Sequence, residues 1–243
     1  MNLCRIKNLF NVKFSQNFHD YLGDNKTLDY EDKIYKKNPT VTHIISETMS
    51  NESKRIIKLW EQKKIKAMGE VAFEAYMKKI KNIGKEFHDL MEQLLKDKSL
   101  NVKSNNECFR YIESVKAVVP LINRPIALES ECEHSELKYR GRFDGIVYLK
   151  NSDQPYLLEW KTVHEKKTVD SLKKTYDSPI QMAAYIGAIN SVSDNNFGKI
   201  RHALLVYAYA TGQPADYFIL NSDQISHYWD IWLEKVSCYH AKS

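Results

Sequence analysis

Apolar positions along the chain change their spacing near Pro125. From about residue 50 to residue 98 they recur every three to four residues, which is the period of an amphipathic helix. Ser50 is a candidate N-cap of this run, and Gly69 and Gly84 are its expected interruptions. After Pro125 the spacing is that of strands. The pattern therefore predicts helices first and a sheet afterwards.

The later part of the chain predicts strands with helices between them. Strands are expected at 126–133, 137–149 and 156–163, with a turn at 151–155, and the other expected elements are a helix at 108–118, a helix at 179–190, a strand at 200–210, a turn at 211–214 and a closing helix at 223–239. Three successive strands, a helix and a fourth strand form a meander with a helical crossover. The expected fold class is mixed α/β, with a central sheet flanked by helices.

The N-terminal segment differs in composition from the rest of the chain. Residues 1–19 contain no acidic residue, whereas Arg5, Lys7 and Lys13 are basic and the apolar residues can share a helix face. A basic, acid-poor, amphipathic leader is typical of a mitochondrial transit peptide, and an ordinary surface tail is the alternative. The expected bounds are a leader and linker at 1–40 and a single domain at 41–243, divided into a helical region at 41–120 and a core at 121–243.

Composition excludes several classes of protein. The chain has 243 residues, 43% of them apolar, and a formal net charge of +5, which permits an anionic partner without requiring one. Its four cysteines include no CxxC pair, which excludes a zinc ribbon and a four-cysteine iron–sulfur clasp. No apolar stretch approaches the ~18 residues of a membrane helix, so no membrane partner is expected.

The helical run carries an excess of basic side chains. Between residues 54 and 98, twelve lysines and arginines stand against seven acidic residues. These side chains can form solvated helix faces, or they can form a basic surface for a phosphate backbone. The composition leaves both interpretations open.

Charged residues interrupt two of the predicted strands. Because strand side chains alternate in direction, Glu159 and Lys161 point to one face of the third strand. On the strand before it, Asp144 shares a face with Arg142. If the two strands form a hairpin around residues 150–155, Asp144 and Glu159 meet on the same side of the sheet.

Two carboxylates and a lysine on one side of a sheet call for a physical explanation. A buried carboxylate is costly, and two close carboxylates also repel each other. A divalent cation such as Mg²⁺ or Mn²⁺ relieves both costs, because these ions prefer oxygen ligands. The alternatives are a structural cluster of ion pairs, Asp144–Arg142 and Glu159–Lys161, or a metal-free acid and base pair, which leaves Lys161 without a role.

Two helices contribute further candidates. His88 precedes Met91 and Leu95 by three and seven residues, so it points toward the apolar side of its helix and is a third possible ligand. A hydrogen-bonded core histidine is the alternative. Gln181 and Tyr185 stand four apart on the helix after the third strand and so share a face, where they can hold a substrate phosphate or base. A surface amide and a core-edge aromatic are the alternatives there.

Taken in order, these residues resemble the RecB-like branch of the PD-(D/E)XK nuclease superfamily. The branch has a helix histidine, a strand aspartate, a (D/E)xK triplet and a QxxxY motif. The corresponding residues are His88, Asp144 in Gly141–Asp144, Glu159–Lys161 and Gln181–Tyr185. A lone ExK triplet is a weak signal, but four elements in order are a strong one. Within that branch the chain looks closest to mitochondrial exonucleases, over roughly residues 40–240 and above all at 127–130, 159–162 and 177–188.

The resemblance implies a restriction-endonuclease-like PD-(D/E)XK core with an N-terminal helical region, and it implies a metal site. His88, Asp144 and Glu159 would ligate Mg²⁺ or Mn²⁺, with the backbone carbonyl of Trp160 as a further ligand. Asp144, Glu159 and Lys161 would be the catalytic residues. Lys161 would orient the attacking water and stabilise charge on the phosphate.

The resemblance also implies a path for DNA. Gln181, Tyr185 and Arg142 would bind the strand. The basic helices of the N-terminal region would arch over single-stranded DNA, with lysines for its backbone and aromatics such as Trp60 and Tyr76 for its bases.

The sequence thus predicts a metal-dependent exonuclease that hydrolyses phosphodiester bonds at single-stranded DNA ends or flaps. We expect a monomer in the mitochondrial matrix that serves mitochondrial DNA maintenance. The alternatives are an endonuclease of the DNA-repair type and a non-catalytic nuclease fold that only binds nucleic acid.

Overall fold

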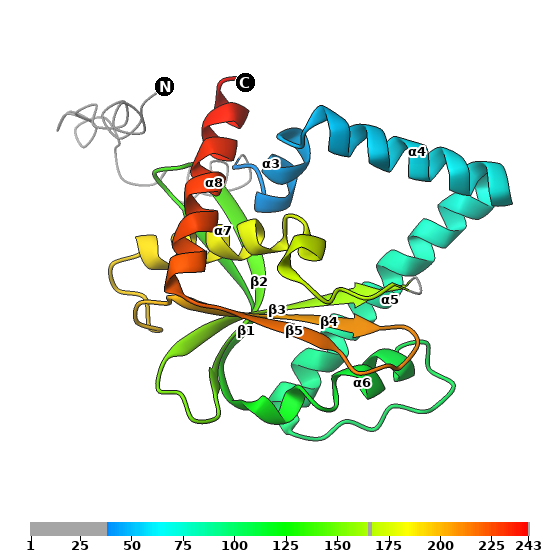
Figure 1. The fold of residues 1–243 in the computed structure, drawn as a ribbon. Helices are drawn as coiled ribbons and strands as arrows, with labels where there is room; N and C mark the ends of the chain where they lie inside the picture. Colours follow the sequence, from blue (N-terminus) through cyan, green and yellow to red (C-terminus); the bar gives the residue numbers. More distant parts are fainter. Residues whose placement is uncertain (1–37, 165–166, 243) are drawn as a thin grey trace, which may run out of the picture. The chain divides into compact units, whose positions relative to one another are not determined.

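The computed structural model describes residues 38–164 and 167–242. The leader predicted at residues 1–40 lies outside the described residues, apart from its last three positions. Figure 1 shows the helices and strands that follow.

Three helices open the described part of the chain: α3 spans Val41–Glu47, α4 spans Asn51–Met68 and α5 spans Glu70–Asp97. Ser50 caps α4 as predicted, because its Oγ accepts a hydrogen bond from the backbone N of Ser53 at 3.1 Å. Gly69 separates α4 from α5 at φ 85°, which confirms that interruption. A shorter helix α6, Phe109–Val115, and a 3₁₀ turn η1, Val119–Leu121, replace the helix expected at 108–118.

The second interruption predicted for the helical run, at Gly84, is wrong. Gly84 lies inside α5. The same part of α5 buries Ile83, Phe87, Met91 and Leu95 against the domain. Burial of this stripe outweighs the ~1 kcal/mol that a glycine costs in a helix interior relative to alanine.

The strands form one sheet in the order β1-β2-β3-β4-β5. Their bounds are Ile122–His134 for β1, Tyr139–Leu149 for β2, Pro155–Val163 for β3, His202–Tyr209 for β4 and Asp216–Leu220 for β5. Neighbouring strands are antiparallel except β3 and β4, which are parallel. The predicted meander and helical crossover are therefore confirmed, whereas β5 was not predicted.

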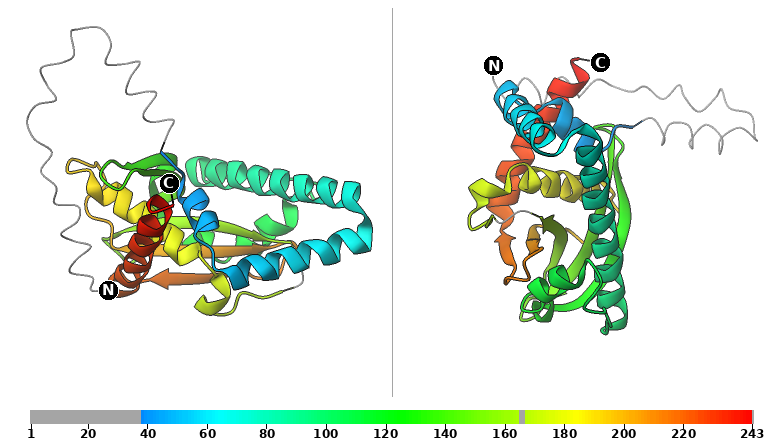
Figure 2. Two further views of the ribbon diagram at one scale, coloured as in Figure 1. Left: turned by 90° about the horizontal axis from the view of Figure 1, so that it is seen from above. Right: turned by 90° about the vertical axis from the view of Figure 1, so that its right-hand side faces the viewer.

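Helices cover both faces of the sheet (Figures 1 and 2). The crossover from β3 to β4 contains a 3₁₀ turn η2, Leu172–Thr175, and α7, Ser178–Ser191, and the chain closes with α8, Ser222–His240. One apolar core joins the sheet to α3, α7 and α8, and a second joins its other face to α5 and α6. A mixed α/β fold with a sheet flanked by helices and an N-terminal helical region is thus confirmed.

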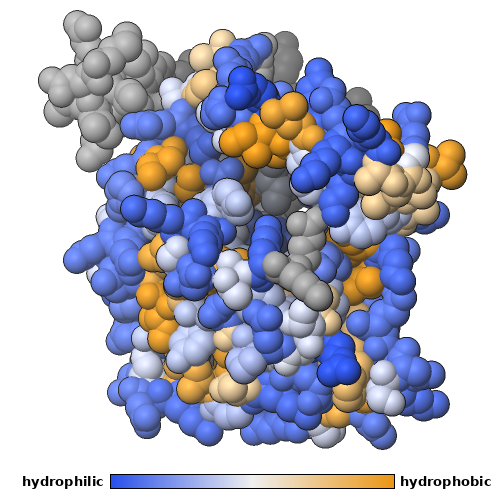
Figure 3. Space-filling view, turned by 45° about the vertical axis from the view of Figure 1, so that its right-hand side comes forward, coloured by the Kyte–Doolittle hydropathy of each residue, from blue (hydrophilic) through white to orange (hydrophobic). Residues whose placement is uncertain are grey.

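We call α4 and residues 70–82 of α5 the arch. No residue of α4 is buried, and the buried residues of α5 begin at Ile83. Figure 3 shows a mostly hydrophilic surface that apolar groups interrupt. The exposed apolar side chains of the arch are Ile56, Ile57, Leu59, Met68, Val71 and Met77. Across the described ranges, no helix is both long and apolar enough to cross a membrane.

Candidate active site

Asp144 and Glu159 lie on neighbouring strands near one end of the sheet. The β2–β3 register pairs Gly145 with Leu158, so the next residues along, Asp144 and Glu159, stand opposite each other. Their exposed fractions are 8% and 3%. The backbone N of Trp160 donates a hydrogen bond of 2.6 Å to Oδ2 of Asp144. The structure therefore places the two carboxylates together, on the side of β3 opposite the buried Trp160 ring.

His88 reaches these carboxylates from α5. Phe87 and Met91 on the same helix are fully buried and hold it against the domain. The Nδ1 atom of His88 lies 3.2 Å from Oδ1 of Asp144 and 3.5 Å from Oε1 of Glu129. Burial by itself lowers the pKa of His88. Hydrogen bonds to Asp144 and Glu129 and the nearby negative charges outweigh this effect and raise the pKa to about 10.

Glu129 is a member of this cluster that the sequence did not single out. It lies on β1 between Leu128, which pairs with Gly145, and Ser130, which pairs with Phe143, so it faces Asp144. Its backbone adopts φ 46°, in the left-handed region that residues with a Cβ rarely occupy. Glu129 belongs to the stretch 127–130 that already resembled the mitochondrial exonucleases. Glu131 and Glu133 on the same strand are also acidic, so acidity alone did not mark Glu129.

Arg142 contacts Glu129 and not Asp144. Its Nε donates to Oε2 of Glu129 at 3.0 Å, and its side chain is 61% exposed. The alternative to a metal site was a structural cluster of two ion pairs. One of them, Glu159–Lys161, is present at 2.8 Å, whereas Arg142 pairs with Glu129 and not with Asp144. The guanidinium thus offsets part of the negative charge of the cluster.

Lys161, Gln181 and Tyr185 form a chain of hydrogen bonds that starts at Glu159. Nζ of Lys161 donates to Oε1 of Glu159 at 2.8 Å and to Oε1 of Gln181 at 2.9 Å. Nε2 of Gln181 donates to the same Glu159 oxygen at 3.0 Å and to the Tyr185 hydroxyl at 2.8 Å. Burial lowers the pKa of Lys161, but the charges of Glu159 and Asp144 outweigh it and raise that pKa, so the ammonium stays charged.

Gly141 leaves the space that this network needs. A Cβ at that position would lie 2.3 Å from Cε1 of Tyr185, whose side chain is almost fully buried. The motif Gly141–Asp144 therefore supplies both the carboxylate and the gap for the Tyr185 ring. The close packing of the Tyr185 ring thus explains why the motif begins with glycine.

The donors of the cluster fit a divalent cation. Ligand atoms of His88, Glu129 and Asp144 lie within 4.8 Å of one another. Oε2 of Glu159 is buried and accepts no hydrogen bond within the described structure. Burial, together with the charge of Asp144, raises the pKa of Glu159. The oxygens of the three carboxylates, one of them without a hydrogen-bond donor, are hard ligands that suit Mg²⁺ or Mn²⁺, and the imidazole of His88 adds a nitrogen ligand.

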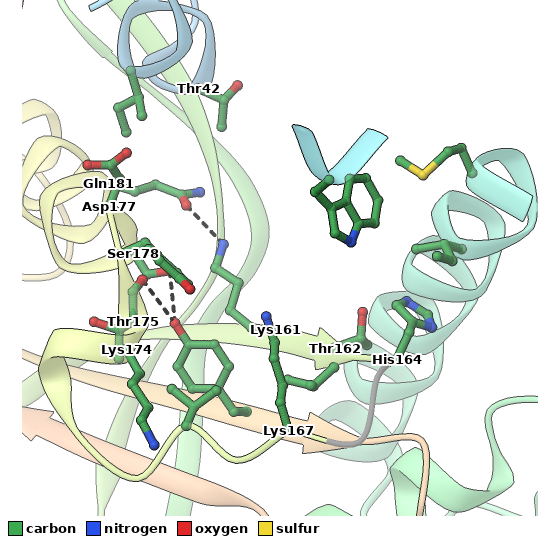
Figure 4. A pocket seen from close by; sticks show the side chains of 18 of the residues that line it. Thr42, Lys161, Thr162, His164, Lys167, Lys174, Thr175, Asp177, Ser178 and Gln181 are labelled. Carbon is green, nitrogen blue, oxygen red and sulfur yellow. Dashed lines mark hydrogen bonds between the residues drawn. The ribbon is translucent and has the colours of Figure 1, made fainter. Parts of the chain in front are cut away.

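A cavity of about 510 Å³ lies beside this cluster. Lys161 and Gln181 line it, and Figure 4 shows them from close by, joined by their hydrogen bond. The arch contributes Trp60 and Tyr76 to its wall. Residues from α3, the end of β3, the segment before α7 and the start of α7 complete the lining, among them Thr42, His164, Lys167, Lys174, Thr175 and Ser178. The cavity is therefore basic and partly aromatic.

Of the residues predicted for the site, His88, Asp144, Glu159, Lys161, Gln181 and Tyr185 come together. Trp160 joins them through its backbone N–H, and ligation by its carbonyl stays a prediction. The roles assigned to these residues also stay predictions at this point.

Known proteins with a similar sequence share one name. No family model matches the chain. Curated relatives named Mitochondrial genome maintenance exonuclease 1 are 34% identical in Xenopus tropicalis, 31% in Mus musculus and 29% in Homo sapiens, each over 84% of this chain. The chain spans only 58–59% of the length of these relatives.

Among solved structures, the crystal structure of SSO0001 aligns with 73% of this chain and 70% of its own chain at 15% identity. Its TM-score of 0.35 is too low to support an argument about fold or activity. The sequence relatives, in contrast, match the region in which the motifs lie. Over 84% of its length the chain is therefore similar in sequence to proteins named mitochondrial genome maintenance exonuclease 1, in agreement with the resemblance in its motifs.

Proposed function

We propose that this chain is a metal-dependent exonuclease that hydrolyses phosphodiester bonds at the ends or flaps of single-stranded DNA. The observation that carries the proposal is the position of the ion pair between buried Glu159 and half-buried Lys161 beside the His88, Glu129 and Asp144 cluster. The names of the relatives support an exonuclease that acts in mitochondria.

The acidic cluster would hold the metal. His88, Glu129, Asp144 and Glu159 are the candidate ligands, and the Trp160 carbonyl is a further one. Bound Mg²⁺ or Mn²⁺ would supply a Lewis acid at the phosphate and lower the pKa of a coordinated water. The orphaned Oε2 of Glu159 supports this assignment, because a buried carboxylate oxygen without a donor is costly unless a cation binds it.

Lys161 would stabilise the charge that develops on the phosphate. Its ammonium is held in place by Glu159 and Gln181, and its side chain is 26% exposed, so it can still meet a substrate in the cavity. A fixed positive charge is more effective in the transition state than a mobile one, because it needs no reorganisation. Gln181 and Tyr185 would position both Lys161 and the strand.

The cavity supports a single-stranded substrate. Lysines suit the phosphate backbone, and aromatic rings suit unpaired bases. In the arch, Nζ of Lys64 lies 5.8 Å from the ring centroid of Trp60 and 5.5 Å from that of Tyr76, which combines both kinds of group. Arg142, bound to Glu129 through Nε and otherwise exposed, would contribute a further phosphate contact.

Three further points belong to the proposal. The meander, the crossover helix and the placement of the motifs on them support a RecB-like PD-(D/E)XK core. A place in the mitochondrial matrix and a role in mitochondrial DNA replication or repair fit the relatives' names and the predicted leader. The proposal further includes that the chain is a monomer.

The test compares DNA forms in Mg²⁺ or Mn²⁺ and in chelator. Linear single strands, 5′-blocked and 3′-blocked strands, circular single strands and duplex are incubated with the purified chain. We expect linear single strands to be degraded only with metal, and circles and blunt duplex to survive. Cleavage of circles would indicate the endonuclease alternative, and degradation of blunt duplex would contradict the single-strand preference. Binding without cleavage of any form would indicate the non-catalytic alternative.

A further inference from the structure

Tyr176 combines an unusual backbone with an exposed aromatic ring. It lies between η2 and α7 at φ 51° and ψ −126°, a conformation that residues with a Cβ rarely adopt. Its side chain is 79% exposed. The ring is exposed, so it gains no stability from burial, and the backbone that holds it there is strained. The stability of the fold therefore does not explain why Tyr176 adopts this conformation.

The residues on both sides of Tyr176 are fixed. Thr175 is 1% exposed, and its Oγ1 donates to the carbonyl of Leu172 at 2.6 Å. The hydroxyl of Tyr207 lies 3.3 Å from the carbonyl oxygen of Thr175 and 3.0 Å from Oγ of Ser178, as hydrogen-bond partner of both. Figure 4 shows Thr175 and Ser178 beside each other at the wall of the cavity. The backbone of Tyr176 therefore cannot relax without breaking contacts on either side.

Tyr176 lines the same cavity as Lys161 and Gln181. Nζ of Lys167 lies 5.9 Å from its centroid. The other tyrosines of this lining and its tryptophan are less exposed: Trp60 and Tyr76 are half-buried, and Tyr207 is buried. Tyr176 is thus the aromatic residue of the lining whose ring is most available to a ligand.

An exposed ring beside lysines, in a cavity that contains the candidate catalytic lysine, has the chemistry of a stacking platform. A flat aromatic face attracts the face of an unpaired nucleobase, while ammonium groups attract the phosphates on either side of it. Sequence-specific hydrogen bonds are not needed, since every base has such a face.

We propose that Tyr176 is a positioning residue that stacks on one unpaired base of the strand and so fixes the adjoining phosphate at Lys161. The inference rests on the proposed function. It adds a single base-binding position at the mouth of the cleavage site and assigns that position to one side chain.

The test measures the affinity of the full chain for a single strand in chelator, where nothing is cut. A series of strands carries one abasic nucleotide at successive positions. Tyr176→Ala should bind the intact strand between about 5-fold and about 150-fold more weakly than the wild type. One abasic position should weaken wild-type binding by a similar factor and leave Tyr176→Ala unaffected, because both changes remove the same contact.

Tyr176→Phe keeps the ring and should bind like the wild type. Tyr217→Ala is the matched control, since Tyr217 is also exposed, at 45%, but lies on β5 and does not line the cavity. The proposal is overturned if Tyr176→Ala binds like Tyr217→Ala, or if no abasic position couples to Tyr176.

A second variant separates stacking from a structural role. Tyr176→Gly relieves the positive φ, so its thermal melting temperature should equal or exceed that of the wild type, while its affinity should fall as in Tyr176→Ala. A clear fall in melting temperature for Tyr176→Gly would mean that the ring supports the fold, which contradicts the proposal. If the wild type degrades single strands with metal while these variants bind normally, stacking fails and the proposed function stands.

Discussion

The backbone N–H of Trp160 donates to Oδ2 of Asp144 at 2.6 Å, across the boundary between β3 and β2. Trp160 is the residue between Glu159 and Lys161, so Asp144 fixes the part of β3 that carries both. The same carboxylate approaches His88 through its other oxygen, at 3.2 Å. Asp144 therefore has a structural role, and the proposed function gives it a chemical role as well.

The two roles of Asp144 can be separated. Asp144→Ala leaves the Trp160 N–H buried without an acceptor, so we expect it to lose about 1–3 kcal/mol of unfolding free energy. Asp144→Asn keeps an acceptor oxygen and should unfold closer to the wild type. Both should lose cleavage, since an amide is a poor replacement for a charged metal ligand. Urea unfolding and nuclease assays measure the two effects, and equal stability of the two variants would contradict the structural role.

Metal should stabilise the folded chain through Glu129. A ligand that binds only the native state at a hundred times its dissociation constant adds about 2.7 kcal/mol, so Mn²⁺ should raise the melting temperature of the wild type. Glu129→Gln should lose much of that rise. Glu131→Gln, the same change two residues along β1, should keep it. An unchanged rise in Glu129→Gln would exclude Glu129 as a ligand.

Two glycine substitutions should act in opposite directions. Gly141→Ala puts a Cβ 2.3 Å from Tyr185, so it should cost about 1–3 kcal/mol and reduce cleavage through displacement of Tyr185 and Gln181. Gly84→Ala meets only Thr162 Oγ1 at 3.8 Å, inside α5, and should stabilise by about 0.5–1 kcal/mol. Unfolding measurements check both signs, and a neutral Gly141→Ala would show that the Tyr185 ring is free to move.

Gln181 should matter more for cleavage than Tyr185. Gln181→Ala removes one acceptor of Lys161 and a donor to Glu159, so we expect about a tenfold or larger fall in kcat/KM. Tyr185→Phe removes one hydroxyl that only receives from Gln181, a bond worth about 0.5–1.5 kcal/mol. Steady-state kinetics compares them, and a greater loss in Tyr185→Phe would reverse the proposed order.

Sequence periodicity predicted the elements whose stability is carried by long apolar patterns. It found α5, α7, α8 and β1 to β4, because these elements each have a wide buried face. It also found α4, which buries no residue, through its periodicity, the Ser50 cap and the interruption at Gly69. It gave no separate element at α3, although α3 lies within the helical region expected at 41–120. Val41, Ile44 and Ile45 are β-branched, which weakens the helical signal, and they are buried in the core. It missed β5 because a five-residue edge strand exists through its pairing with β4.

The same distinction applies to the site. The positions of Asp144, Glu159 and Lys161 follow from strand alternation and one hairpin, both of which are local. Glu129 depends on a positive φ and on the register between β1 and β2. Neither can be derived from residue spacing, so its place beside His88 needed the structure.

The central claim is that Lys161 acts in the chemical step at this site. Cleavage of a linear single strand in Mn²⁺ should be compared in the wild type, in Lys161→Ala and in Lys174→Ala, a cavity lysine that pairs with Asp170 instead. We expect Lys161→Ala to bind the strand nearly as well as the wild type but to cleave it at least about a hundredfold more slowly, while Lys174→Ala keeps most activity. Wild-type cleavage by Lys161→Ala would contradict the account.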